Sequence, residues 1–226
     1  MRCKRAVIDS LNLSAEHMES IFFYHQDYTI EVVKTKNVFN PTVWAETFGK
    51  SLKRNIIEAK IIHTYLGLTL PLKTFAVTPK SQTVEFAGLH GYSERSKYLL
   101  QHLHELKSQL QHTRVMRLDV AIDFNGSIPK RVIAHLKKNR EPFKWKNTTY
   151  FKTAKEKKTN RMMDIKIYDK ALHAKLNKPL YRLEFCFKSE YLKKVLLKDV
   201  KSVYSKMEKT IKKATGLSVK INHILA

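Results

Sequence analysis

Residues that interrupt or cross-link a chain are scarce in this sequence. Its 226 residues include only 6 glycines, 6 prolines and 2 cysteines, with no low-complexity tract and no internal repeat at solenoid spacing. Cys3 and Cys186 are too few for a disulfide framework and form no metal-ligand spacing. We therefore expect one compact domain over residues 1–226 and a reducing cytoplasm as its compartment.

Long apolar runs and acidic residues are scarce as well. No stretch approaches the ~20 apolar residues of a membrane-spanning helix, and residues 1–13 lack the apolar segment of a secretory signal. We therefore expect a cytoplasmic protein without a membrane partner. The sequence has 43 Lys and Arg but only 20 Asp and Glu, which gives a net charge of +23. A chain this basic is usually held near a polyanion, and nucleic acid is the first candidate.

Three runs alternate polar and apolar residues: RLDVAID (117–123), DIKIYDK (164–170) and YRLEFCF (181–187). This period of two predicts half-buried strands, in which successive side chains point to opposite faces. If the three strands pair in one sheet, one face is apolar and needs a cover of helices. The other face then gathers carboxylates, a tyrosine and several cations, which is the composition of a functional site.

The rest of the chain predicts further strands and helices around this sheet. We expect strands at 4–9, 28–34, 59–68, 74–77, 83–88 and 148–151. We expect helices after Ser14, at 41–55, after Ser93, at 128–138 and at 189–214, with a loop at 139–145 and an exposed basic connector at 152–161. The predicted fold class is α+β, with a central antiparallel sheet, helices on one face and a basic DNA-binding groove on the other.

The carboxylates of the polar face are candidate metal ligands. Asp119 and Asp123 lie about 13 Å apart along one strand at ~3.3 Å per residue, so one of them needs Glu184 of a neighbouring strand to hold an ion. Carboxylate oxygens suit Mg²⁺ or Mn²⁺ and leave positions for phosphate and water. The alternative is a solvated face of ion pairs, in which these acids neutralise the arginines and lysines of the same strands.

Tyr168 is a candidate nucleophile on the same face. Its hydroxyl titrates near ~10, so attack at neutral pH needs a cation or base beside it, and Lys166 and Lys170 are its neighbours on that face. Such a site could cleave and rejoin a phosphodiester through a phosphotyrosine. The alternative is an ordinary tyrosine at the surface of a sheet.

The order of these motifs resembles a known family. RLDVAIDF, TTYF, DIKIYDK and YRLEF follow one another as in the rolling-circle replication initiators of the plasmid Rep_trans type and the related replication proteins of filamentous phages. GLHGYSERSKYLLQHL (88–103) is also similar to the segment before the first motif, so the resemblance covers about residues 82–192. The remaining part, 189–226, is expected to be helical and rich in lysine.

The resemblance implies an activity and a set of roles. It implies a metal-dependent enzyme that nicks and joins an origin strand through a 5′-phosphotyrosine, with Tyr168 as nucleophile and Lys170 as its cationic helper. Asp119, Asp123 and Glu184 would be the ligands of Mg²⁺ or Mn²⁺. The partner would be single-stranded or cruciform origin DNA of a plasmid or phage, and a host helicase and a second copy of the chain stay open as further partners.

The basic residues beside the motifs are candidate contacts for DNA phosphates. These candidates are Arg117, Lys155, Lys157, Lys158, Arg161, Lys166, Arg182, Lys193 and Lys194. A non-catalytic protein that binds or regulates an origin, an RNA-binding protein and a merely solvated lysine face are the alternatives. His102 and His104 form a His-x-His pattern, but they lie in a segment predicted to be helical. Side chains two positions apart on a helix point about 200° from each other, so we do not expect these two to chelate one metal ion.

Overall fold

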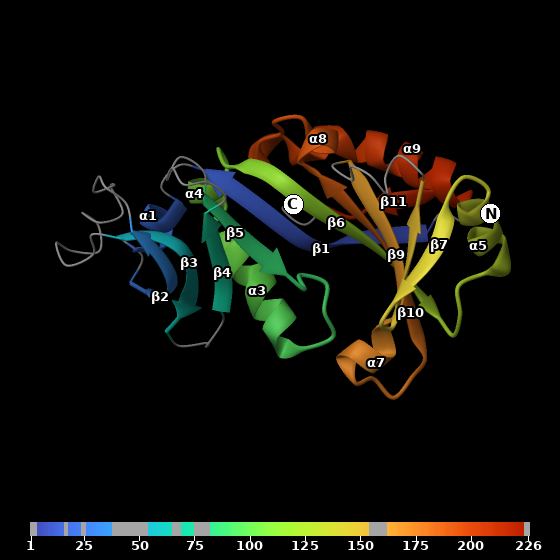
Figure 1. Cartoon of the computed structure of the whole chain (residues 1–226), viewed down its shortest axis with the longest axis horizontal. Helices are drawn as coiled ribbons and strands as arrows, with labels where there is room; N and C mark the ends of the chain where they lie inside the picture. The colour runs from blue at the N-terminus through green and yellow to red at the C-terminus, as the bar shows by residue number, and fades with distance from the viewer. Residues whose placement is uncertain are drawn as a thin grey trace.

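The computed structural model describes residues 4–15, 18–23, 26–37, 54–64, 69–74, 82–153 and 162–223. The strands are β1 (Lys4–Ala15), β2 (Tyr28–Asn37), β3 (Arg54–His63), β4 (Thr69–Thr74), β5 (Gln82–Ala87), β6 (Arg114–Asn125), β7 (Glu141–Trp145), β8 (Thr148–Lys152), β9 (Met163–Asp169), β10 (Leu180–Lys188) and β11 (Val219–Ile221). They form one sheet in the order β2-β3-β4-β5-β1-β6-β10-β9-β8-β7. Figure 1 shows this sheet running from β2 and β3 at one end to β7 at the other. Neighbours in that order are antiparallel, and β11 adds in parallel to the start of β1.

Helices cover the apolar side of this sheet. They are α1 (Met18–Phe23), α3 (Glu94–Glu105), α4 (Lys107–Leu110), α5 (Lys130–Lys137), α7 (Lys170–Ala174), α8 (Ser189–Leu192), the 3₁₀ helix η1 (Leu197–Val203) and α9 (Tyr204–Thr215). Apolar side chains of all of these except α7 join those of the sheet in one hydrophobic core. Figure 1 shows α8 and α9 together along one side and α7 apart from them. The α+β class with a large antiparallel sheet is therefore confirmed.

The described part of the chain has no helix that is both long and apolar enough to cross a bilayer.

The predicted alternation along β6 is confirmed. Leu118, Val120, Ile122 and Phe124 lie in the core with 3% exposure or less. The intervening residues face the opposite side, where Asp119 pairs with Arg117 of the same strand and Asp123 with Arg182 of β10. Burial of the apolar residues and pairing of the polar ones fix the register of β6 in the sheet. A slip by one residue would turn the apolar residues to the polar face and the polar residues to the core.

A bulge at Asp9 changes the face of β1. Ala6 and Ile8 point into the core before it, whereas Leu11 and Leu13 do so after it. The pairing with β6 shifts between Ile8 and Ser10, and the carbonyl of Asp9 accepts hydrogen bonds from two backbone N–H groups of the segment that follows β5. Asp9 and Ser10 therefore both lie on the polar side, and the extra residue returns Leu11 and Leu13 to the core.

Several predicted boundaries are wrong. Ser14 does not begin a helix, because it lies inside β1 and pairs with Thr83 of β5. The loop expected at 139–145 contains β7, which forms a hairpin with β8. Residues 69–73, between the strands expected at 59–68 and 74–77, belong to β4, and Pro71 lies there at a position where β4 pairs only with β3.

The helix expected at 189–214 is also wrong as one continuous element. Lys193 and Lys194 adopt the left-handed backbone conformation with φ of 42° and 65°, which ends α8 after one turn. The next residues are extended, and Leu196 forms a bridge with Arg114 before η1 and α9 begin. The helical spacing of apolar residues predicted a continuous helix because both halves bury their residues in the same core.

Two further expectations fall largely outside the described residues. Of the helix expected at 41–55, only residues 54 and 55 are described, and they belong to β3. Of the strand expected at 74–77, only Thr74 is described, as the last residue of β4.

The two histidines of the His-x-His pattern point in different directions, as predicted. His102 is 8% exposed and its ring lies 4.2 Å from that of His63 between ring centroids, whereas His104 is exposed. The Nδ1 atom of His102 lies 2.8 Å from a carboxylate oxygen of Glu105.

Stability should fall as the pH is lowered below about 6.5, in part because of His102. Burial and the adjacent His63 lower the pKa of His102 from 6.5, although Glu105 and Asp27 oppose this shift. Since the unfolded chain then binds the proton more tightly, stability is complete above 6.5 and decreases as the pH falls through the lowered pKa. Urea unfolding should show a slope of at most about 1.4 kcal/mol per pH unit from this group. The slope should be shallower in His102→Gln and unchanged in His104→Gln; equal slopes in all three proteins would contradict the assignment.

Candidate functional site

The three strands predicted to carry the site are neighbours, with β10 between β6 and β9 (Figure 1). Their register aligns the polar residues in rows across the sheet. Arg182 of β10 pairs with Asp123 of β6 and with Tyr168 of β9. The next row holds Glu184 and Lys166, and the third holds Cys186 with Asp119 and Asp164.

Tyr168 donates a hydrogen bond to Glu184, with 2.7 Å between its hydroxyl oxygen and Oε2 of the carboxylate. The other carboxylate oxygen, Oε1, lies 2.7 Å from Nζ of Lys166. Burial raises the pKa of Tyr168, and the charge of Glu184 raises it further. Burial opposes ionisation of Glu184 too, but Lys166 and Tyr168 outweigh burial and lower the pKa of this acid. At neutral pH the pair is therefore a phenol bound to a carboxylate.

Asp119 lies beside this pair and forms a two-pronged ion pair with Arg117. The two distances between guanidinium nitrogens and carboxylate oxygens are 2.7 Å and 2.6 Å. Burial raises the pKa of Asp119 to about 6, against the opposing effect of Arg117. Cys186 completes the cluster, and burial raises the pKa of its thiol well above the ordinary value, so that it stays protonated.

Asp123 belongs to a separate cluster around Arg182, whose side chain is 0% exposed. Arg182 binds Asp123 through Nε and NH2 at 2.7 Å and 2.8 Å, and Asp9 through NH1 at 2.6 Å. Tyr92 also donates to Asp123 at 2.6 Å. Burial opposes ionisation of Asp123, but these donors outweigh burial and lower the pKa of its carboxyl. Of the three predicted metal ligands, the structure thus brings Asp119 and Glu184 together and places Asp123 with Arg182.

Asp119 and Glu184 have the donor chemistry of a site for a hard divalent ion. In the described residues, one oxygen of each and the sulfur of Cys186 lie within 4.8 Å of one another. The protonated thiol is a poor ligand for Mg²⁺ or Mn²⁺, which leaves the two carboxylates and water. An ion would displace the ends of Arg117 and Lys166. Their side chains are 35% and 21% exposed, so both can turn toward solvent.

Lys170, the predicted cationic helper, begins α7 directly after β9. Burial lowers the pKa of its ammonium group, and the positive charge of Arg182 lowers it further, although Asp9 and Glu184 oppose the shift. A lysine with a lowered pKa gives up its proton more readily than an exposed one. This property suits a cation that can exchange protons near neutral pH.

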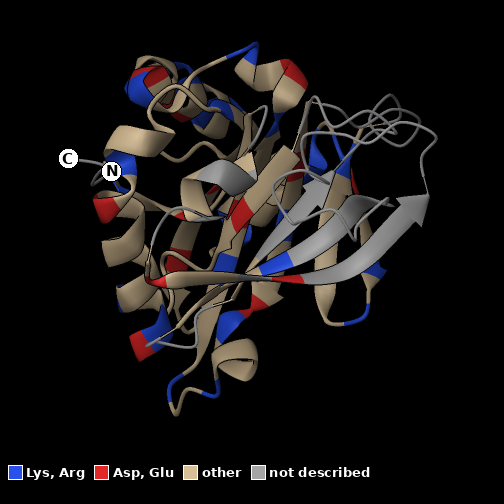
Figure 2. Ribbon diagram, turned by 90° about the vertical axis from the view of Figure 1, so that its left-hand side faces the viewer, with Lys and Arg blue, Asp and Glu red and all other residues tan. Residues whose placement is uncertain are grey.

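The predicted DNA-binding cations fall into three groups. Arg117, Lys166 and Arg182 are engaged with acids of the site. Lys193 and Lys194 are exposed and line a pocket of about 660 Å³ beyond the end of β10. The other four, Lys155, Lys157, Lys158 and Arg161, lie outside the described residues. Figure 2 shows Lys and Arg interspersed with Asp and Glu along the central strands.

The sequence reasoning missed Asp9, His90 and Tyr92. Asp9 ends the run Ala-Val-Ile-Asp (6–9), which is similar to Val-Ala-Ile-Asp (120–123), and this internal likeness was the available signal. His90 contributes its backbone carbonyl to Arg182 at 3.2 Å, and its ring nitrogen Nε2 lies 3.6 Å from Asp123. The resemblance included residues 88–103 but gave His90 and Tyr92 no role, and the backbone hydrogen bonds to Asp9 bring this segment to the site through tertiary packing.

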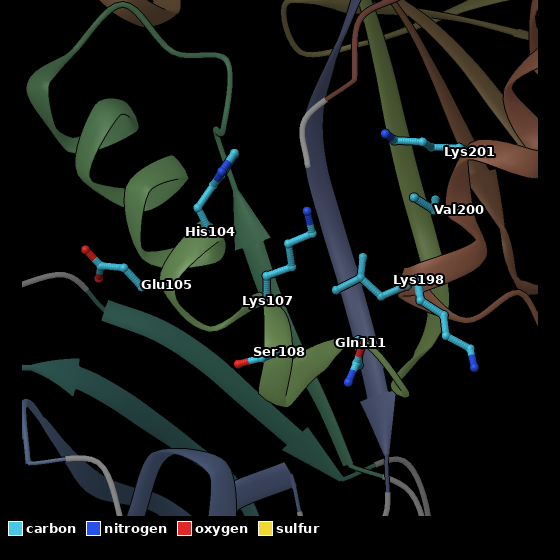
Figure 3. Close-up of a pocket in the computed structure, with 9 residues that line it drawn as sticks. His104, Glu105, Lys107, Ser108, Gln111, Lys198, Val200 and Lys201 are labelled. Carbon is cyan, nitrogen blue, oxygen red and sulfur yellow. The ribbon is translucent and has the colours of Figure 1, made fainter. Parts of the chain in front are cut away.

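A different pocket, of about 540 Å³, lies in the helix layer (Figure 3). Lys107, Ser108 and Gln111 line one side, and Lys198 and Lys201 of η1 line the other. None of the predicted catalytic or metal-binding residues borders this pocket. It is therefore separate from the Tyr168 site.

A scan against protein-family models and a search of curated proteins give no match. Among solved structures, the chain is similar to the rolling-circle replication initiator protein from Geobacillus stearothermophilus. The TM-score is 0.45 and the identity 12%, over 81% of this chain and 74% of that chain. That protein is of the class that the strand motifs resemble, but at this TM-score the similarity carries neither a fold family nor an activity to the present chain.

Proposed function

We propose that the protein initiates rolling-circle DNA replication by nicking and rejoining an origin strand through a phosphotyrosine at Tyr168. The observation that carries this proposal is the hydrogen bond of 2.7 Å between the Tyr168 hydroxyl and Glu184, beside Asp119 on an adjoining strand. The proposed nucleophile, its proposed proton acceptor and a second acid lie on paired strands, which are rigid supports for a site. The net charge of +23 supports a polyanionic substrate.

In the proposed step, the Tyr168 oxygen attacks a backbone phosphorus and the bond from phosphorus to the 3′ oxygen breaks. Because the pKa of Tyr168 is raised, the phenol is not ionised beforehand, and its proton passes to Glu184 as the new bond forms. As the cationic helper, Lys170 would offset negative charge on the attacking Tyr168 oxygen, and the departing 3′ oxygen would take a proton from water. The products are a 5′-phosphotyrosine and a free 3′ hydroxyl, and reversal of the same step joins the strand again.

Asp119 and Glu184 would hold a Mg²⁺ or Mn²⁺ ion after the ends of Arg117 and Lys166 turn away. When bound, such an ion would offset negative charge on the phosphate oxygens. The other contributions to the proposed nicking step come from side chains of the protein. Arg182, fixed between Asp9 and Asp123, sets the position of the Tyr168 row.

The proposal is tested with a pool of random-sequence single-stranded oligonucleotides incubated with the whole protein and Mg²⁺ or Mn²⁺. We expect a protein–DNA adduct that survives denaturant and a released strand that a polymerase can extend from its 3′ hydroxyl. Chelation of the divalent ion should prevent both products. Tight binding without any cleavage would contradict the enzymatic proposal.

The second candidate is a non-catalytic DNA-binding protein that marks or regulates an origin. One specific observation favours it: Asp119, Asp123 and Glu184 are already paired with Arg117, Arg182 and Lys166 within the protein. For such a protein, Asp119→Asn should leave DNA binding unchanged and no adduct should form with any ion. Competition by matched DNA and RNA strands at a fixed salt concentration separates either candidate from an RNA-binding protein.

A further inference from the structure

A basic pocket lies at the end of the polar face farthest from Tyr168. Arg114, Met162, Lys193 and Lys194 line it together with Ser189 and Glu190, and its volume is about 660 Å³. Lys193 and Lys194 are exposed, and neither they nor Arg114 pair with an acid in the described part of the chain. The pocket therefore presents three cations that are available to bind an anionic ligand.

The backbone holds these two lysines in an uncommon conformation. Both have positive φ, at 42° and 65°, which residues other than glycine rarely adopt. The N–H of Lys193 donates to the carbonyl of Ser189 at 3.0 Å, and the carbonyl of Val195 accepts from the N–H of Val115 in β6 at 2.8 Å. Bonds on both sides fix the turn, and strain maintained in this way is typical of functional positions.

The pocket continues the rows of the catalytic face. Beyond Tyr168 and Lys166 on β9 comes Asp164, whose carboxylate lies 2.6 Å from Nζ of Lys188. In the next row of the sheet, Lys188 of β10 lies opposite Arg117 of β6. The pocket begins at Met162, just before β9. Tyr168 lies six positions after Met162, which is about 20 Å at ~3.3 Å per residue. That length corresponds to about six stacked nucleotides at ~3.4 Å each.

The direction of the Tyr168 hydroxyl indicates which part of a DNA strand would lie there. The hydroxyl points from its own row toward Glu184, in the direction of the pocket. In phosphoryl transfer the attacking and leaving oxygens lie on opposite sides of the phosphorus. The leaving 3′ oxygen would therefore lie on the pocket side of Tyr168. The DNA segment that terminates in this oxygen would continue over Lys188 and Arg117.

We propose that the pocket of Arg114, Lys193 and Lys194 binds the phosphates of the DNA segment 5′ of the nick, the segment that ends in the new 3′ hydroxyl. The polarity of this proposal rests on the proposed nicking function. The pocket would keep the released end beside Tyr168 without a covalent bond. Retention of this end favours rejoining over loss of the strand.

Binding is measured first, without any cleavage, by fluorescence anisotropy of a 5′-labelled twelve-nucleotide thymidine strand with a free 3′ hydroxyl. In the variant Lys193→Asn/Lys194→Asn, asparagine tolerates the left-handed conformation and removes both charges. We expect about tenfold weaker binding, and a slope of affinity against salt that is smaller by about 1.4, from two lost phosphate contacts.

The control Lys209→Gln/Lys212→Gln removes two exposed lysines of α9 and should change affinity less than about twofold. Equal effects of the two variants, with unchanged melting temperatures, would overturn the pocket as a DNA site.

Polarity is measured next, on an oligonucleotide that the wild type cleaves. Shortening the DNA 5′ of the cleaved bond to two nucleotides should raise the KM of the wild type but not that of Lys193→Asn/Lys194→Asn. Shortening it 3′ of the bond should affect both proteins alike, and the reverse pattern would overturn the assignment. If the wild type cleaves no DNA, the proposed function fails, and the anisotropy measurement alone decides whether the pocket binds DNA.

Discussion

Glu184→Gln should lower the rate of adduct formation by about 10²–10⁴, the usual contribution of a general base. Glutamine keeps the size of the side chain and can still accept a hydrogen bond from Tyr168. It cannot take up the proton, and it removes the charge that faces Lys166. The measurement is single-turnover formation of the denaturant-stable adduct at a saturating protein concentration.

The matched control is Glu94→Gln, which makes the same change at an exposed residue of α3 that pairs with Lys97. This variant should react at the rate of the wild type. Urea unfolding of both variants separates a chemical effect from a loss of folded protein. A Glu184→Gln protein that is folded and fully active would remove Glu184 from the proton transfer.

Arg182→Leu should destabilise the protein by about 3–5 kcal/mol, because it leaves the buried Asp9 and the half-buried Asp123 without their cation. Arg182 is wholly buried and binds Asp9 and Asp123 at 2.6–2.8 Å. Such a loss is a large part of the roughly 5–15 kcal/mol that holds a typical domain folded. The measurement is the free energy of unfolding in urea at pH 7.

Two further variants make this result specific to the ion cluster. Arg131→Leu removes an exposed arginine of α5 and should change stability by no more than about 0.5 kcal/mol. Adding Asp9→Asn and Asp123→Asn to Arg182→Leu should restore part of the loss, since the uncompensated charges are gone. A loss below about 1 kcal/mol in Arg182→Leu would show that the cluster contributes little to folding.

The central part of the fold could be predicted because its signals are local. In RLDVAID, DIKIYDK and YRLEFCF, the period of two specifies both the strand and the face of each residue, and the three strands pair as expected. The helix after Ser93 and the one at 128–138 are confirmed as α3 and α5 for the same reason, since each has one apolar face. The assignment of roles to Tyr168, Lys170, Asp119, Asp123 and Glu184 stays a prediction, as does the single domain over 1–226.

What the sequence did not reveal depends on tertiary packing. The bulge at Asp9, which returns Leu11 and Leu13 to the core, depends on pairing between β1, β5 and β6, which no local pattern encodes. The break at Lys193 and Lys194 lies between a hydrogen bond to Ser189 and one from Val115 of β6 to Val195, whereas the apolar spacing around it is that of a helix. Asp123 and Glu184 share a face, but only the side-chain contacts show that Arg182 holds Asp123 in a cluster of its own.

The most direct test of the central claim is identification of the residue that becomes joined to DNA. Wild-type protein is incubated with the oligonucleotide pool and Mg²⁺ or Mn²⁺, the adduct is digested with protease and nuclease, and the modified peptide is sequenced by mass spectrometry. We expect the phosphonucleotide on Tyr168, no adduct in Tyr168→Phe and an unchanged adduct in Tyr150→Phe, which alters a tyrosine of the neighbouring strand β8. An adduct that persists in Tyr168→Phe, or one mapped to another residue, would contradict the account.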